Sequence, residues 1–187
     1  MVPLQDAARK LGAWCWAERR CFEVLGGWVR DEDDPAVKAM LATHSRHHAW
    51  RAERWFEVLP LAYVAPVEAL VAPPADADVF DLLAAIEGSG QRLAAHYHLV
   101  YRKLVSAYEA SPDLMSPVSD GPALRAIRII VGDALHDLAE ADVVSPRSHG
   151  GISGLDRVTQ LHDAVAKVQV RAENAPGTTT ALLCWGS

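Results

Sequence analysis

Pairs of metal-binding side chains, spaced three residues apart, are the feature of this 187-residue chain best suited to chemistry. One pair is His44 and His47, and the other is Asp133 and His136. Residues three apart lie on one face of an α-helix, so each pair could hold a metal ion between facing helices. Imidazole nitrogens and carboxylate oxygens are ligands for iron, manganese and zinc.

Two single glutamates stand before these pairs, each on an apolar helix face. Glu18 interrupts an apolar stripe, and Glu87 follows Leu83 by one turn. A buried charge costs several kcal/mol unless it is paired or bound to metal. We therefore predict one metal site between four helices, with these ligands: Glu18, His44, His47, Glu87, Asp133 and His136. The alternative is a metal-free network that pairs Glu18 with His47 and Glu87 with His136.

Apolar residues recur at helical spacing over five segments, and no strand pattern competes with them. The predicted helices cover about 5–29, 35–59, 78–110, 122–143 and 154–173. Residues 60–77 contain four prolines and predict a long connection between the second and third helices. We expect one all-α domain over 1–187, with a core bundle at about 5–143 and a fifth helix and tail at about 154–187.

The composition excludes several classes of protein. A net charge of −6 and a pI of about 5.7 disfavour a nucleic-acid or anionic-membrane surface. The sequence contains no apolar run long enough to span a bilayer and no signal-peptide pattern, so we expect no membrane partner. An odd number of cysteines without a Cys-x-x-Cys motif indicates a reduced, cytoplasmic setting. These are Cys15, Cys21 and Cys184.

Other polar residues on the helices are expected to lie outside the site. His48 falls toward the edge of its apolar stripe, and Asp137 is expected to point away from the bundle axis. His96 and His98 face different directions on a helix, and we expect His98 inside and His96 outside. Three arginines of the second helix are assigned to its solvated face: Arg46, Arg51 and Arg54.

This order of residues resembles the ferritin-like superfamily over about 5–143. Its di-iron members place Glu on helix one, Glu-x-x-His on helix two, Glu on helix three and Glu-x-x-His on helix four. On this resemblance Glu18 and Glu87 correspond to the single glutamates, and His47 and His136 to the histidines. The segment 86–92, Ile-Glu-Gly-Ser-Gly-Gln-Arg, is similar to helix three of the tRNA-hydroxylase-like branch.

Two ligand positions depart from the family pattern. His44 and Asp133 stand where bridging glutamates are expected. A neutral histidine binds one metal and leaves the pair more positive, and aspartate is one methylene shorter than glutamate. The departures leave three outcomes open, namely an asymmetric dinuclear centre, a mononuclear centre, or a relic site without metal.

The resemblance implies a ferritin-like four-helix bundle with a long crossover between helices two and three. It implies a non-haem di-iron oxidoreductase or hydroxylase, with manganese or zinc as other metals. It further implies a small-molecule or nucleoside substrate, an external electron donor and a homodimer. Four residues are candidates to support the ligands: Trp55, Gln91, Tyr97 and Tyr101.

Two other functions compete with this one. A ferritin-like protein that has lost its metal would act as a binding or scaffold module, which the His44 and Asp133 substitutions favour. A DinB-like metal-dependent transferase would use three histidines, for which His44, His48 and His136 are available. That assignment leaves Glu18 and Glu87 unexplained.

Overall fold

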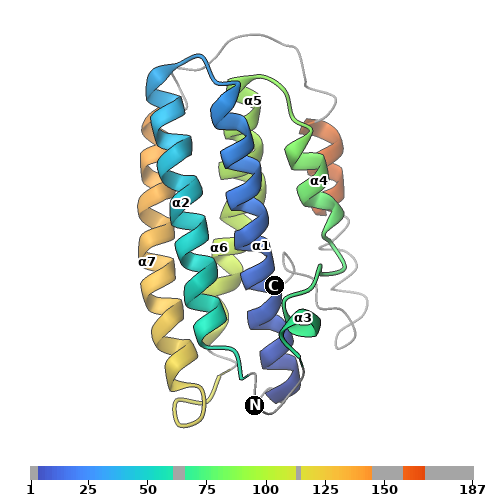
Figure 1. The fold of residues 1–187 in the computed structure, drawn as a ribbon, viewed down its shortest axis with the longest axis vertical. Helices are drawn as coiled ribbons and strands as arrows, with labels where there is room; N and C mark the ends of the chain where they lie inside the picture. Colours follow the sequence, from blue (N-terminus) through green and yellow to red (C-terminus); the bar gives the residue numbers. More distant parts are fainter. Residues whose placement is uncertain (1–3, 61–65, 113–114, 145–157, 167–187) are drawn as a thin grey trace.

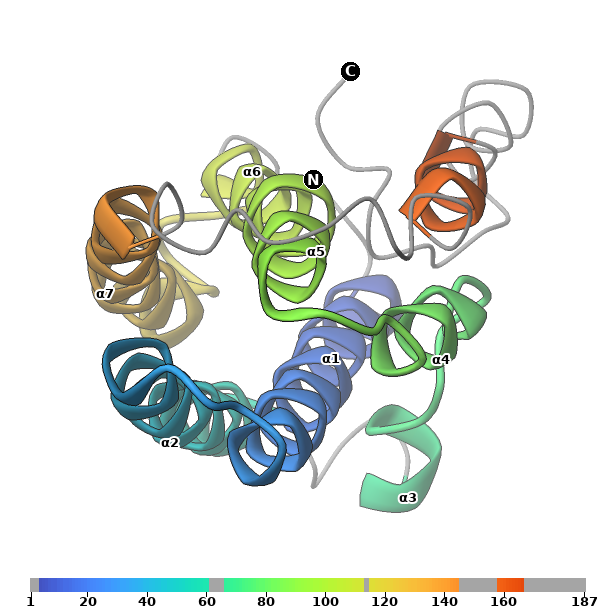
Figure 2. The same cartoon turned by 90° about the horizontal axis from the view of Figure 1, so that it is seen from above.

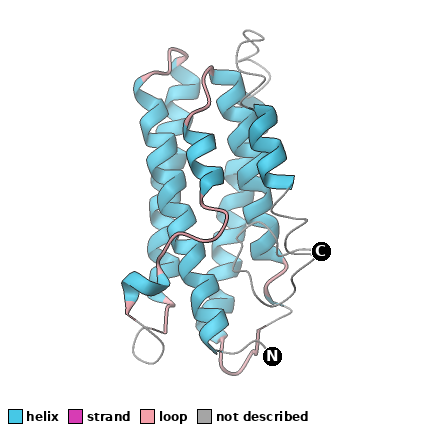
Figure 3. Cartoon of the chain, turned by 90° about the vertical axis from the view of Figure 1, so that its right-hand side faces the viewer, coloured by secondary structure: helices cyan, strands magenta, loops and turns pink. Residues whose placement is uncertain are grey.

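The computed structural model describes residues 4–60, 66–112, 115–144 and 158–166, and these ranges are helical without any strand (Figure 3). The predicted all-α class is confirmed. None of the helices in these ranges has the length and apolar character needed to cross a membrane.

The first two helices form an antiparallel pair. They are α1, Leu4–Arg30, and α2, Pro35–Glu57. Asp34 caps α2, because its carboxylate accepts hydrogen bonds from the backbone N–H groups of Ala36 and Val37. Pro35 occupies the first turn, where its missing N–H costs nothing. Asp34 and Pro35 therefore set the start of α2, at the residue where the sequence predicts it.

The connection after α2 contains two short helices that pack on α1. They are α3, Val67–Leu70, and α4, Asp78–Ala84. Gly12 of α1 allows the approach of α3, because a Cβ at this position would overlap the backbone carbonyl of Leu70. The irregular segment predicted at 60–77 thus contains α3 among its described residues.

The third long rod is made of three consecutive helical stretches. These are α5, Ser89–Leu93; the π-helix η1, Ala94–Tyr101; and α6, Arg102–Glu109. The single helix predicted at 78–110 is instead broken between α4 and α5, where Gly88 adopts a φ of 83°. That backbone conformation favours glycine and turns the chain into the rod.

The last long helix is α7, Gly121–Val144, and a shorter helix covers 158–166. Viewed along the long axis, α1, α2, α7 and the α5–η1–α6 rod surround a common interior (Figure 2). Helices α1 and α7 run in one direction, and α2 and the rod run in the other (Figure 1). Leu161 and Val165 of the short helix join the hydrophobic core. The rest of the predicted fifth helix and tail lies outside the described residues.

Aromatic side chains fill one part of the interior. The Trp14 and Trp55 ring centroids lie 4.8 Å apart, and Tyr108 meets Trp14 edge-on at 5.0 Å. This packing ties α1, α2 and α6 together and leaves the neighbouring turns of the same helices to carry polar residues.

Candidate metal centre

A completely buried arginine lies among the acidic residues of the bundle. Arg51 Nε donates to a Glu18 carboxylate oxygen at 3.3 Å. Its Nη1 donates to Asp133 at 2.5 Å and to Asp137 at 2.8 Å. The prediction of a solvated Arg51 is wrong: residue 51 lies three and seven positions after His48 and His44, on the same inward face of α2.

These charges support one another. Burial acts to lower the pKa of Arg51, but Glu18 and the other anionic partners hold it well above its usual value. Burial acts to raise the pKa of Asp137, but Arg51 and His44 bring it below the ordinary value. At neutral pH, the Arg51 cation therefore faces an ionised Asp137.

Two histidines of α2 meet a carboxylate of α7 beside this arginine. His47 Nδ1 lies 2.8 Å from Asp137 Oδ1, and His44 Nε2 lies 3.5 Å from the same oxygen. Glu140 Oε2 is 3.3 Å from His44 Nε2. Ligand bonds of about 2.1 Å at tetrahedral or octahedral angles place neighbouring donor atoms about 3.0–3.4 Å apart. His44, His47 and Asp137 could therefore hold one metal ion after small adjustments, with Glu140 beside them.

The surroundings of His44 favour the neutral imidazole that can bind a metal ion. Burial lowers the pKa of His44, although Asp137 opposes the shift, so the imidazole is neutral near pH 7. The Tyr97 hydroxyl lies 2.7 Å from His44 Nδ1. A hydroxyl can donate or accept, so Tyr97 orients this ring whether Nδ1 or Nε2 carries the proton. Tyr97 therefore contacts one of the predicted ligands, and its supporting role at a metal stays a prediction.

The site lies at the edge of the bundle. The side chains of His44 and Asp137 are buried, whereas the His47 side chain is 36% exposed and that of Glu140 is 45% exposed. A metal bound here would keep a side open to solvent or to a small molecule, which is the arrangement of catalytic rather than structural sites.

The six predicted ligands do not all lie together. His44 and His47 are at the site, and Asp133 reaches Arg51 from the same side. Glu18 is buried, but its carboxylate accepts hydrogen bonds from Arg51 Nε, His48 Nδ1 and the Tyr108 hydroxyl. It belongs to the same network without contacting the His44–His47 pair.

Two predicted ligands, Glu87 and His136, lie on the surface. Glu87 falls in the break between α4 and α5, so it is not on a helix face that points inward. His136 is exposed on α7 because its neighbour Asp137 takes the inward position. The prediction that Asp137 points away from the axis is corrected accordingly.

The histidines at 48, 96 and 98 also depart from expectation. His48 and His96 are completely buried, and the His98 side chain is 42% exposed. A π-helical turn adds a residue relative to an α-helix and rotates the residues after it. The α-helical spacing used for the prediction therefore assigned His96 and His98 to the wrong faces of η1. The i+4 spacing of His48 from His44 was a usable signal, as was the i+4 spacing of Asp137 from Asp133.

Comparisons of the chain with protein-family models, with curated proteins and with solved structures found no match.

Proposed function

We propose that this protein is a non-haem iron oxidoreductase or hydroxylase with a mononuclear centre held by His44, His47 and Asp137. The observation that carries the proposal is the convergence of their donor atoms at a partly open edge of the bundle, where one Asp137 oxygen lies 2.8 Å from His47 Nδ1 and 3.5 Å from His44 Nε2. Two histidines and one carboxylate with open positions are the ligand set of many iron(II) oxygenases. Manganese or zinc could occupy the same donors.

One metal fits these residues better than the di-iron centre that the resemblance implies. The positive charge between Glu18 and Asp137 is already supplied by the Arg51 guanidinium. The guanidinium already bonds both carboxylates, so they are not available to a second iron, and Glu87 and His136 are too far outside the interior to complete its ligand set. The resemblance to the ferritin-like superfamily is retained as a proposal for the fold. The directions of the helices support it, with α1 and α7 opposed to α2 and the third rod (Figure 1).

Each residue has a separate part in the proposed centre. An iron ion bound there would supply dioxygen binding and electron transfer. His44 and His47 provide neutral nitrogen ligands, and Asp137 provides one oxygen while Arg51 holds the other. Tyr97 fixes the His44 ring, and the Glu140 carboxylate, 3.3 Å from His44 Nε2, could accept a proton.

The substrate, the electron donor, the cellular setting and the oligomeric state are also proposals. The open edge at His47 and Glu140 suits a small organic or nucleoside substrate. No flavin or nicotinamide motif appears in the sequence, so an external electron donor is proposed, together with a cytoplasmic setting and a homodimer.

Reaction of the iron-loaded protein with oxygen tests this function. Protein loaded with one equivalent of Fe²⁺ under argon should consume oxygen in the presence of a reductant, and Asp137→Asn should abolish the consumption. His136→Gln is the matched control on α7 and should behave as wild type, because His136 is exposed. Iron that binds without reacting with oxygen would overturn the oxidoreductase proposal.

A metal-free binding or scaffold module is the second candidate, and Arg51 favours it. The network already pairs Arg51 with Asp137, and His47 with Asp137, without any ion. On this alternative His47→Gln changes neither metal content nor oxygen consumption, and the protein's role lies in binding a partner.

A further inference from the structure

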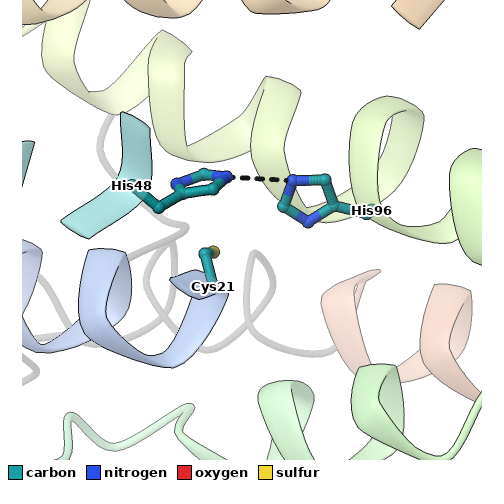
Figure 4. Close-up of side chains that lie close together, drawn as sticks. All are labelled: Cys21, His48 and His96. Atoms are coloured by element: carbon teal, nitrogen blue, oxygen red, sulfur yellow. Dashed lines mark hydrogen bonds between the residues drawn. The ribbon is translucent and has the colours of Figure 1, made fainter. Parts of the chain in front are cut away.

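A cysteine and two histidines meet in the closed interior, away from the partly open edge. Cys21 comes from α1, His48 from α2 and His96 from η1, and all three are 0% exposed. The two imidazoles point toward each other, with the Cys21 side chain beneath them (Figure 4). One ligand atom from each residue lies within 4.8 Å of the others.

The two histidines are held as neutral imidazoles. Burial lowers the pKa of His48 and of His96 well below the ordinary value, and the Arg51 charge adds to the effect in both. Their Nε2 atoms lie 3.2 Å apart. His96 Nδ1 is buried without a hydrogen-bond partner among the described residues. Both rings are therefore in the form that binds metal, with their Nε2 atoms close together.

Glu18 orients the His48 ring so that its Nε2 atom could bind a metal ion. Its carboxylate lies 2.5 Å from His48 Nδ1, so Nδ1–H donates to Glu18 and the Nε2 lone pair faces His96 and Cys21. A carboxylate behind a ligating histidine is the usual support in metal sites. The Tyr101 ring stacks on His96 at a centroid distance of 5.3 Å and holds this ring in place.

From this geometry we infer that Cys21 Sγ, His48 Nε2 and His96 Nε2 form a second, closed site for a thiophilic metal ion, of the copper or zinc class. A set of one thiolate and two imidazoles is characteristic of copper and is also used by zinc. On binding, the Cys21 thiol loses its proton to solvent, and the thiolate and both neutral imidazoles become ligands.

The inference is independent of the centre proposed above. The two sets share no ligand: His44 and His47 face Asp137, whereas His48 faces Cys21 and His96. The closed site has no exposed ligand, so it is suited to holding the fold or carrying electrons rather than to binding substrate.

Cobalt substitution tests the inference, because a Co²⁺–thiolate bond gives an intense near-ultraviolet charge-transfer band. The full-length chain carrying Cys184→Ser, reduced and refolded from urea with Co²⁺, should show this band. Refolding removes any barrier to metal entry, and Cu⁺ or Zn²⁺ should abolish the band by competition. The stronger competitor identifies the metal class.

Matched variants locate the ligands. Cys21→Ser should abolish the band, whereas Cys15→Ser should retain it, since Cys15 donates its thiol to the Ala52 carbonyl instead. His96→Gln should abolish the band, and His98→Gln should retain it, since His98 is exposed. Should Cys21→Ser not fold, His96→Gln with His98→Gln as its control supplies the same test.

Two outcomes would overturn the inference. One is cobalt binding with d–d bands but no thiolate band, which would leave the His44–His47–Asp137 centre intact. The other is a thiolate band that survives both Cys21→Ser and His96→Gln in the folded protein. Conversely, a thiolate band with no effect of His47→Gln on metal binding would retain this site and remove the one proposed for oxygen chemistry.

Discussion

Arg51 is the residue on which the polar interior depends most. It is completely buried, and it is the cation shared by Glu18, Asp133 and Asp137. Removing one partner of a buried ion pair leaves an uncompensated charge, whereas replacing a whole network by apolar residues can be harmless. The interior therefore depends on the balance between Arg51 and its carboxylates rather than on any one hydrogen bond.

Arg51→Met is expected to lower the free energy of unfolding by about 3–5 kcal/mol, because Glu18 and Asp137 lose their buried counter-charge. Urea denaturation with a chelator present measures the effect. Arg54→Met is the control one turn further along α2; its pairing with Glu57 is at the surface, so a change within about 0.5 kcal/mol is expected. Equal effects of the two substitutions would contradict the charge-balanced interior.

The buried histidines predict a pH dependence of stability in the metal-free protein. Burial holds the pKa of His44, His48 and His96 below 6.5, so the unfolded chain binds protons there before the folded one does. The free energy of unfolding should therefore fall as the pH drops from about 7 to 5.5. The raised pKa of Glu18, caused by burial, acts in the opposite sense but closer to its usual value of 4.5.

His96→Gln should flatten this dependence by up to about 1.4 kcal/mol per pH unit, the contribution of one proton. Chelator-treated protein unfolded in urea at a series of pH values gives the slopes. His98→Gln is the control at an exposed position of the same helix and should leave the slope unchanged. Identical slopes for wild type and His96→Gln would show that His96 does not remain neutral in the fold.

At the scale of single residues, the sequence was sufficient where the helical register was regular. Glu18 was predicted from an interrupted apolar stripe and His44 from its spacing to His47, and both are completely buried. Asp137 and His96 were missed for different reasons. Asp137 competes with His136 for one inward position, which a pattern of ligand spacing cannot resolve, and the orientation of His96 depends on η1.

Helix boundaries were the most predictable elements. The end of α1, both ends of α2 and the start of α7 lie within two residues of the predicted limits. Asp34 and Pro35 mark the start of α2. The rod at 89–109 was not predictable to the same degree. A π-helix depends on tertiary packing rather than on local propensity. The break before α5 depends on the positive φ of Gly88.

Two glycines of α1 have different surroundings, so replacing each with alanine should change the stability of the protein in opposite directions. Gly12→Ala should destabilise the protein by about 1–3 kcal/mol, because its Cβ would overlap the Leu70 backbone and push α3 away. Gly27→Ala should stabilise it by about 0.5–1 kcal/mol, because nothing lies within 4 Å and alanine favours a helix. Thermal unfolding monitored by circular dichroism compares them.

The informative result is which of the two variants, Gly12→Ala or Gly27→Ala, is the more stable. If Gly12→Ala were as stable as Gly27→Ala, the contact between α1 and α3 would not be part of the stable fold. Proteolysis of the two variants would report the same contact separately, with faster cleavage near α3 expected only in Gly12→Ala.

At the scale of the whole molecule, the bundle places two sets of metal-binding side chains on one turn of α2. His44 and His47 face α7, and His48 faces α1 and the third rod. The class of the fold followed from periodicity alone. The pairing of residues across helices did not, because it depends on which helices are neighbours and on their rotation about their own axes.

Metal binding should therefore stabilise the folded protein as a whole. A ligand present at 100 times its dissociation constant adds about 2.7 kcal/mol when it binds only the folded state. Differential scanning calorimetry with and without Mn²⁺ should show a higher Tm that His47→Gln removes. An unchanged Tm in saturating Mn²⁺ would mean that the folded and unfolded chains bind the ion equally.

The most direct test of the proposed metal centre is a Mn²⁺ titration of chelator-treated protein, followed by electron paramagnetic resonance of the free ion. Mn²⁺ prefers oxygen and nitrogen ligands to thiolate, so it should report the His44–His47–Asp137 centre. Wild type and His136→Gln are predicted to bind one equivalent each, and Asp137→Asn and His47→Gln are predicted to bind at least tenfold more weakly, a difference of about 1.4 kcal/mol. Equal binding by all four proteins, or no binding by the folded wild type, would contradict a metal centre at these residues.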